Sequence, residues 1–149
     1  MPFETPPATG AVIEVAQGIF WARMPLPMKL DHVNIYALAD DDGWTLVDSG
    51  MNSGKSRRIM ADLLAGPLGH LPLKRVLVTH HHPDHVGLAG WLAQTYGAEV
   101  MMSRTAWLMA RMLVLDVQES WPHETVEFYR RAGMDADILA ARLAERPFN

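Results

Sequence analysis

Short runs of mainly apolar, β-prone residues, separated by polar turns, fill the first third of the chain. Two pairs of such runs lie on either side of a tight turn, one at Gln17-Gly18 and the other at Asp40-Asp41-Asp42-Gly43. Strand-like segments on both sides of a short Gly-containing turn are typical of a β-hairpin. The pattern therefore predicts two hairpins, over residues 12–24 and 32–47.

The periodicity becomes helical after the second hairpin. Apolar residues at helical spacing predict a helix over residues 53–65, with Asn52 or Ser53 as its cap and Gly66-Pro67 beyond its end. The next segment, residues 75–79 (RVLVT), is apolar without alternation, which predicts a central strand covered on both faces.

The second half of the chain is predominantly helical. A helix is predicted over residues 86–96 and a short strand over 99–102, and no strand pattern follows. Three further helices are expected, over residues 104–116, 122–132 and 135–145. The first of these three is Met-rich and apolar almost all round, which predicts burial in a core or a subunit interface.

This order of elements predicts an α/β fold, with a mixed β-sheet layered with helices and followed by a helical tail. The length of 149 residues is that of one domain. We expect a loose N-terminal arm over residues 1–10, an α/β region over 11–102 and a helical segment over 103–149.

Composition narrows the classes of function. A hydrophobic share of 49% and a charged share of 20% are ordinary for a packed domain. The net charge of -4, without a basic run, disfavours nucleic acid as a partner. The absence of cysteine leaves histidines and carboxylates as metal ligands. No signal-peptide pattern and no stretch of about 18 apolar residues is present, so we expect a cytoplasmic protein without membrane contact.

One segment carries most of the chemical information, the run THHHPDHVG over residues 79–87. His80 and His82 point the same way in an extended chain, so they can share one metal ion. Asp84 and His85 lie where the next helix begins and can address a second ion, as in two-metal hydrolases. An isolated Asp here would more often be a helix cap. Four histidines at the end of a buried strand favour metal binding instead.

These residues resemble the signature of the metallo-beta-lactamase-fold hydrolases, H-x-H-x-D-H, with Thr79 before it and Val86-Gly87 after it. Two further segments are similar to family features: the strand end Leu46-Val47-Asp48-Ser49-Gly50 and the Asn-containing segment over residues 31–36. The resemblance covers residues 11 to about 117. It implies the first half of the family's αββα sandwich.

The resemblance also implies roles for individual residues. His80 and His82 would hold one metal ion, and Asp84 and His85 a second. Asp84 would also act in catalysis by orienting the nucleophile, and Asp48 would support the metal loop from beneath. Zinc is the expected metal, as one or two ions, with iron and manganese as alternatives. The implied reaction is attack of an activated water on an ester, thioester or lactam-like bond of a small molecule, and the hydroxyacylglutathione-hydrolase-like branch is favoured.

The chain departs from the family pattern after His85. The family's third histidine, bridging aspartate and last histidine are not apparent, and His123 reads as part of a surface helix. We therefore expect a fragment of a longer hydrolase, with little activity alone and a tendency to form a dimer. Two other functions remain open: an iron-dependent dioxygenase on the same fold, and a non-catalytic metal-binding or assembly module.

Overall fold

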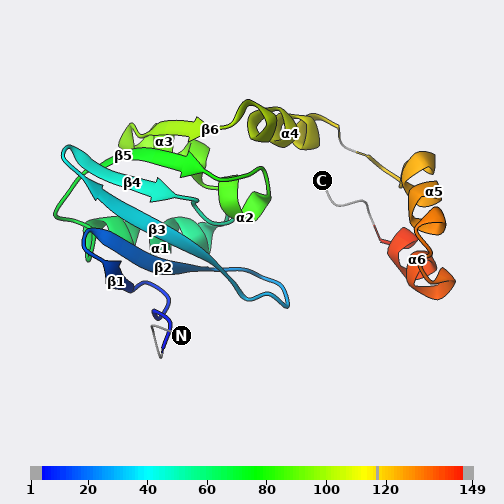
Figure 1. Cartoon of the computed structure of the whole chain (residues 1–149), viewed down its shortest axis with the longest axis horizontal. Helices are drawn as coiled ribbons and strands as arrows, with labels where there is room; N and C mark the ends of the chain where they lie inside the picture. The colour runs from blue at the N-terminus through cyan, green and yellow to red at the C-terminus, as the bar shows by residue number, and fades with distance from the viewer. Residues whose placement is uncertain (1–4, 117, 146–149) are drawn as a thin grey trace. The chain divides into compact units, whose positions relative to one another are not determined.

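A six-stranded sheet forms the centre of the computed structural model, which describes residues 5–116 and 118–145 (Figure 1). Its strands are β1 (Val12–Ala16), β2 (Ile19–Pro25), β3 (His32–Asp40), β4 (Gly43–Val47), β5 (Leu73–Val78) and β6 (Glu99–Met102), adjacent in that order. The first four strands are antiparallel neighbours, whereas β5 pairs parallel with both β4 and β6. Both predicted hairpins and the mixed sheet are confirmed.

Helices connect the parallel strands and follow the last of them. They are α1 (Gly54–Ala65), α2 (Pro83–Val86), α3 (Ala89–Tyr96), α4 (Arg104–Leu115), α5 (His123–Arg131) and α6 (Ala136–Leu143). The Ser53 side chain accepts a hydrogen bond from the Ser56 amide and caps α1, one of the two predicted caps. The predicted α/β fold, a mixed sheet layered with helices and followed by further helices, is therefore confirmed.

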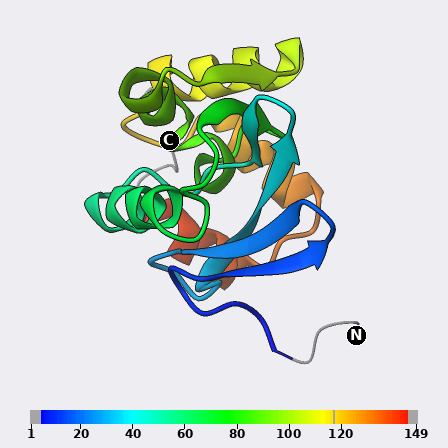
Figure 2. The same ribbon diagram turned by 90° about the vertical axis from the view of Figure 1, so that its left-hand side faces the viewer.

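The core lies between α1, α3 and one face of the sheet (Figure 2). Trp44 and Leu46 of β4 and Val76 of β5 are completely buried there, together with Met60 of α1 and Leu92 of α3. Each such side chain stabilises the fold by about 1.5–3 kcal/mol through burial. This packing fixes the carboxyl ends of β4 and β5, which carry the candidate site.

The other face of the sheet is more open than the sequence predicted. Tyr36, Leu77 and Met101 are 37%, 38% and 42% exposed, and they lie in one cross-strand row with Val47. The prediction that the strand over residues 75–79 is covered on both faces is wrong. In β5 the side chains of Val76 and Val78 are buried in the core, whereas Leu77 points to the opposite, open face of the sheet.

The helix predicted over residues 86–96 is in fact interrupted. Helix α2 ends at Val86 and α3 begins at Ala89, with Gly87 and Leu88 between them. The Leu88 amide donates to Gly50 O and to the Ser49 hydroxyl in place of a carbonyl of its own helix. Tertiary contacts with the segment after β4 therefore replace the helical hydrogen bonds.

The chain divides into two compact units, Met1–Ala110 and Arg111–Asn149. The second unit contains α5 and α6, and the Trp121 indole donates to Glu145 O within it. The division predicted at residues 10 and 102 stays a prediction. Residues 1–4 of the predicted arm and 146–149 of the predicted helical segment lie outside the described residues.

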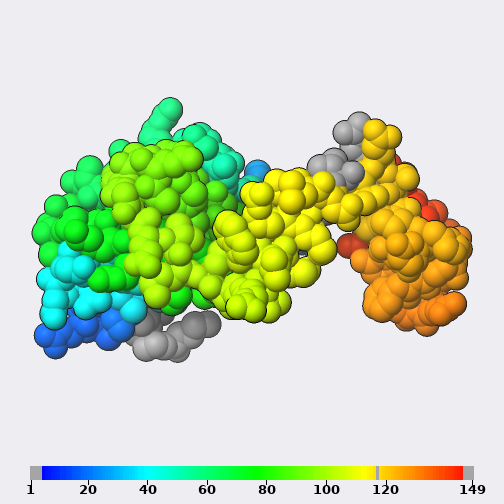
Figure 3. Space-filling view, turned by 90° about the horizontal axis from the view of Figure 1, so that it is seen from above, coloured from blue at the N-terminus to red at the C-terminus, as the bar shows by residue number. Residues whose placement is uncertain are grey.

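Helix α4 is exposed over most of its length, so the expectation that it packs in a core of this chain is wrong, whereas the alternative of a subunit interface stays a prediction. Ala106 is its buried residue, whereas Trp107 and Leu108 are 52% and 58% exposed. Figure 3 shows the surface of this part of the chain in yellow-green and yellow. Among the described helices, none combines the length and the apolar character that crossing a membrane requires.

Candidate metal centre

The candidate site forms where two neighbouring parallel strands end. Strand β4 leads directly to Asp48, and β5 leads to Thr79 and to the histidine loop, which we define as residues 80–85. The Asp48 amide donates to Leu77 O at 2.9 Å and extends the pairing of the two strands by one residue. Residues far apart in the sequence therefore meet at one edge of the sheet.

Asp48 lies beside the histidine loop and hydrogen-bonds Thr79, just before the loop, and His85, its last residue. Its backbone φ of 62° is left-handed, a conformation that Asp and Asn adopt more readily than other non-glycine residues. The carboxylate is buried and accepts hydrogen bonds from the Thr79 amide, the Thr79 hydroxyl and His85 Nδ1, each at 2.8 Å. Asp48 therefore joins the end of β5 to the histidine loop, and its role as the support of a metal site, which the family resemblance implies, stays a prediction.

These hydrogen bonds determine which ring nitrogen of two histidines carries a proton. His85 donates through Nδ1 to Asp48, so its Nε2 keeps a free lone pair. The Thr79 hydroxyl donates to Asp48, and its oxygen can then accept from His80 Nδ1 at 3.0 Å. By this assignment from the hydrogen-bond network, both rings present an unprotonated Nε2, the form that binds a metal ion.

The four predicted ligands come together as two pairs. His80 Nε2 and His82 Nδ1 are 2.9 Å apart, and Asp84 Oδ2 and His85 Nε2 are 3.5 Å apart. The rings of His80 and His85, with centroids 4.0 Å apart, connect the pairs. Two ligands of a tetrahedral zinc ion lie about 3.3 Å apart when each zinc–nitrogen bond is about 2.0–2.1 Å. The donor types suit a transition-metal ion, and the Asp84–His85 spacing is near this value. At 2.9 Å, His80 Nε2 and His82 Nδ1 instead share a hydrogen bond, which a bound ion would replace.

The donors do not form a complete three-ligand set. Among the described residues, no three His, Asp or Glu side chains converge on one ion position. His123 is exposed in the first turn of α5, in the second unit. Partial burial, and then the nearby His85 and His82, lower the pKa of His80 below its ordinary value of 6.5. A low pKa keeps this imidazole neutral and able to bind a cation.

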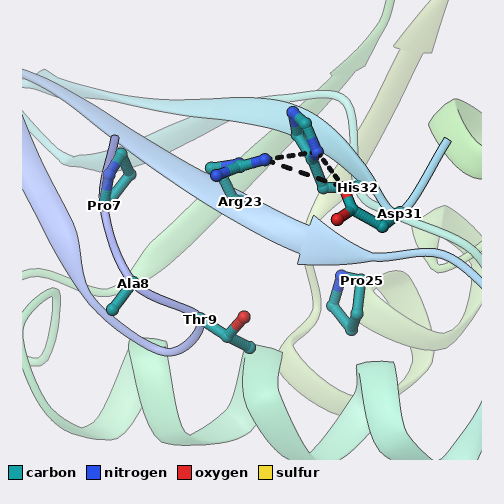
Figure 4. Close-up of a pocket in the computed structure, with 7 residues that line it drawn as sticks. All are labelled: Pro7, Ala8, Thr9, Arg23, Pro25, Asp31 and His32. Carbon is teal, nitrogen blue, oxygen red and sulfur yellow. Dashed lines mark hydrogen bonds and ion pairs between the residues drawn. The ribbon is translucent and has the colours of Figure 1, made fainter. Parts of the chain in front are cut away.

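A histidine outside the histidine loop, His32, lies in a cluster with an arginine and an aspartate. His32, at the start of β3, contacts Asp31 Oδ1 at 2.6 Å and the guanidinium of Arg23 (Figure 4). Arg23 Nη2 also lies 3.8 Å from the Asp31 carboxylate. His32 therefore belongs to an Arg–His–Asp cluster.

Sequence reasoning did not foresee the part played by Ser49 and Thr79. Both were recognised only as neighbours of the motif residues, because nothing in their spacing indicates a contact. Ser49 is completely buried and hydrogen-bonds the backbone of His85 and Leu88. Thr79 joins Asp48 to His80.

Comparison with known proteins gives one family and several relatives. The family model described as "Metallo-beta-lactamase superfamily" matches residues 28–139. "Probable metallo-hydrolase YqjP" of Bacillus subtilis is 37% identical over 67 residues, which are 44% of this chain and 21% of that protein. "Exodeoxyribonuclease WalJ" of Streptococcus pneumoniae is 32% identical over 62 residues, which are 42% of this chain and 22% of that protein.

A solved structure resembles almost the whole chain. It is a beta-lactamase domain protein from Burkholderia ambifaria, 33% identical, with a TM-score of 0.71 over 98% of this chain and 44% of that one. The chain thus spans about a fifth of the length of the two curated relatives and under half of the Burkholderia structure.

Proposed function

This chain belongs to the metallo-beta-lactamase superfamily, and from that premise we propose that it carries the first metal-binding half of a zinc-dependent hydrolase. Members of the superfamily are generally metal-dependent hydrolases. The observation that carries the proposal is the pairing of donors at the edge of the sheet: His80 with His82, and Asp84 with His85.

Each residue of the site has a proposed role. His80 and His82 bind one ion, Asp84 and His85 bind a second, and Asp48 keeps His85 in the metal-binding tautomer. A divalent ion lowers the pKa of a bound water to about 7 and so supplies a nucleophile at neutral pH. With an ion bound, the second carboxylate oxygen of Asp84 would be available to accept a hydrogen bond from the attacking water and orient it toward the substrate.

The proposed substrate is a small molecule with an ester, thioester or lactam-like bond, as in the hydroxyacylglutathione-hydrolase-like branch. The net charge of -4 supports a small substrate over a nucleic acid, whose phosphates favour a basic surface. The relatives are named a metallo-hydrolase and an exodeoxyribonuclease, which favours hydrolysis over the dioxygenase and the non-catalytic module.

Zinc titration by calorimetry tests the metal site. His82→Ala removes one of two paired nitrogens and should abolish or greatly weaken zinc binding. His70→Ala is the matched control, because His70 packs against Trp44 away from the histidine loop. Indistinguishable isotherms for wild type and His82→Ala would refute the assignment.

A panel of chromogenic substrates tests the reaction. It contains an aryl ester, a thioester, a β-lactam and bis(p-nitrophenyl) phosphate, each assayed with and without zinc. The chain is supplied with the part of the Burkholderia ambifaria protein that lies outside the match, because the match covers 44% of that protein. Zinc-dependent turnover of the acyl compounds is expected. Turnover confined to the phosphodiester would contradict the proposed substrate class.

A further inference from the structure

A buried serine beside Asp48 hydrogen-bonds the backbone of the histidine loop. Ser49 has no exposed surface, and both its amide and its hydroxyl donate to His85 O, at 2.9 and 2.8 Å. The same hydroxyl oxygen accepts the Leu88 amide at 3.1 Å. One side chain therefore binds a carbonyl and an amide three residues apart.

These two backbone groups lie at the break between α2 and α3. In an uninterrupted helix, the carbonyl of His85 would accept from the amide four residues later, and the amide of Leu88 would donate to the carbonyl four residues earlier. The helix ends at Val86, and its hydrogen-bond pattern does not continue across the break. Since buried backbone groups need partners, the Ser49 hydroxyl replaces the missing helical bonds, together with the Ser49 amide at His85 O and with Gly50 O at the Leu88 amide.

Asp48 and Ser49 thus hold His85 from two sides. Asp48 accepts from the ring at Nδ1, and Ser49 donates twice to the backbone carbonyl. Fixing a ring by its far nitrogen alone leaves the backbone free to shift, and fixing the backbone alone leaves the ring free to rotate. The two contacts together keep His85 Nε2 beside Asp84 Oδ2, at 3.5 Å.

We propose that Ser49 is a positioning residue for metal binding, which holds the backbone of His85 so that its Nε2 remains directed at the ion shared with Asp84. This inference rests on the proposed function, in which His85 is a metal ligand. It adds that the residue after the supporting aspartate determines the affinity of the second metal position.

A second buried serine provides a matched control. Ser56 is 1% exposed, and its hydroxyl pairs with the Ser53 hydroxyl at 2.8 Å in the first turn of α1. Ser56→Ala therefore removes a buried hydroxyl that hydrogen-bonds Ser53 and not the histidine loop. Ser49→Thr is the conservative variant, because it retains a hydroxyl on the same backbone position.

Titration with cobalt(II), followed by visible absorption, measures metal affinity and ligand geometry. Ser49→Ala should raise the cobalt dissociation constant about 10-fold or more and change the absorption bands, as loss of an outer contact to a ligand does in other metal sites. Ser56→Ala should leave the constant and the spectrum unchanged, and Ser49→Thr should retain most of the affinity. Hydrogen exchange adds an independent measurement: cobalt should slow exchange of the Leu88 amide in the wild type.

The outcomes separate the inference from the proposed function. If His85→Ala binds cobalt as tightly as the wild type, the metal site itself is wrong. If His85→Ala weakens binding but Ser49→Ala matches Ser56→Ala, Ser49 contributes only to folding and the inference fails. Should Ser49→Ala not fold, unchanged exchange of the Leu88 amide on cobalt binding to wild type would overturn the inference on its own.

Discussion

Replacement of Asp48 by asparagine tests how one carboxylate prepares two histidines for metal binding. Asparagine has the same shape and tolerates the left-handed φ of 62°, so the backbone should be retained. Its amide group, however, has one acceptor and one donor side. If its oxygen accepts from the Thr79 amide, its NH2 faces the Thr79 hydroxyl and His85 Nδ1. His85 must then accept at Nδ1 and carry its proton on Nε2.

The expected size of the effect follows from these contacts. Three hydrogen bonds to a charged acceptor, each contributing about 1.5–3 kcal/mol, become neutral bonds of about 0.5–1.5 kcal/mol. The free energy of unfolding should therefore fall by about 3–4 kcal/mol. Zinc affinity should fall about 10–100-fold, since the altered contact holds the favoured tautomer of a ligand.

Calorimetric zinc titration and nitrogen-15 NMR of the histidine rings measure the two effects of Asp48→Asn separately. Asp42→Asn is the control, because Asp42 is 54% exposed and pairs with Arg75 at 2.8 Å. Wild-type zinc affinity in Asp48→Asn, or an Nε2 of His85 that stays unprotonated, would refute the reasoning.

Three further outcomes are expected. Gly87→Ala should destabilise the fold by about 1–3 kcal/mol in chemical denaturation, because its Cβ would lie 2.4 Å from Pro83 O and 2.7 Å from Gly50 O. Gly90→Ala, with open space at its Cβ, should be neutral or stabilising, and equal losses would contradict the packing argument. Light scattering at micromolar concentration should give a mass above 16.6 kDa, because the open sheet face and α4 favour self-association; a stable monomer would contradict this. Thioester hydrolysis by the chain alone should be slow, and addition of the remaining part of the Burkholderia ambifaria protein should raise it; rapid turnover by the chain alone would contradict the incomplete ligand set.

Local sequence patterns predicted most of the secondary structure. Both hairpins and α1 follow from short-range information, since turn residues and apolar spacing act within a few positions. The same local rules failed at Gly87 and Leu88, where hydrogen bonds to Ser49 and Gly50 interrupt the helix. These contacts come from a segment nearly forty residues earlier, and helical periodicity, which reflects only nearby residues, cannot predict them.

The candidate metal ligands could be recognised as a set because they all lie in one short segment, and their binding of a metal ion stays a prediction. Asp48 was assigned through family resemblance, and the structure brings its carboxylate to His85. The exposure of Leu77 and of α4 was not predicted, because an apolar run indicates only that a surface is stabilised by being covered. It does not indicate whether that partner belongs to the same chain.

The contacts around the histidine loop also determine when the site can form during folding. Asp48 meets Thr79 and His85 across 31 and 37 positions, and Ser49 meets Leu88 across 39. These contacts require β4 and β5 to be paired, so the site assembles with the sheet and not before it. In the unfolded chain the loop keeps its histidines but lacks Asp48 and Ser49 beside them, and it should bind an ion more weakly. For a folded chain that binds zinc as proposed, zinc at 100 times its dissociation constant would raise the free energy of unfolding by up to about 2.7 kcal/mol.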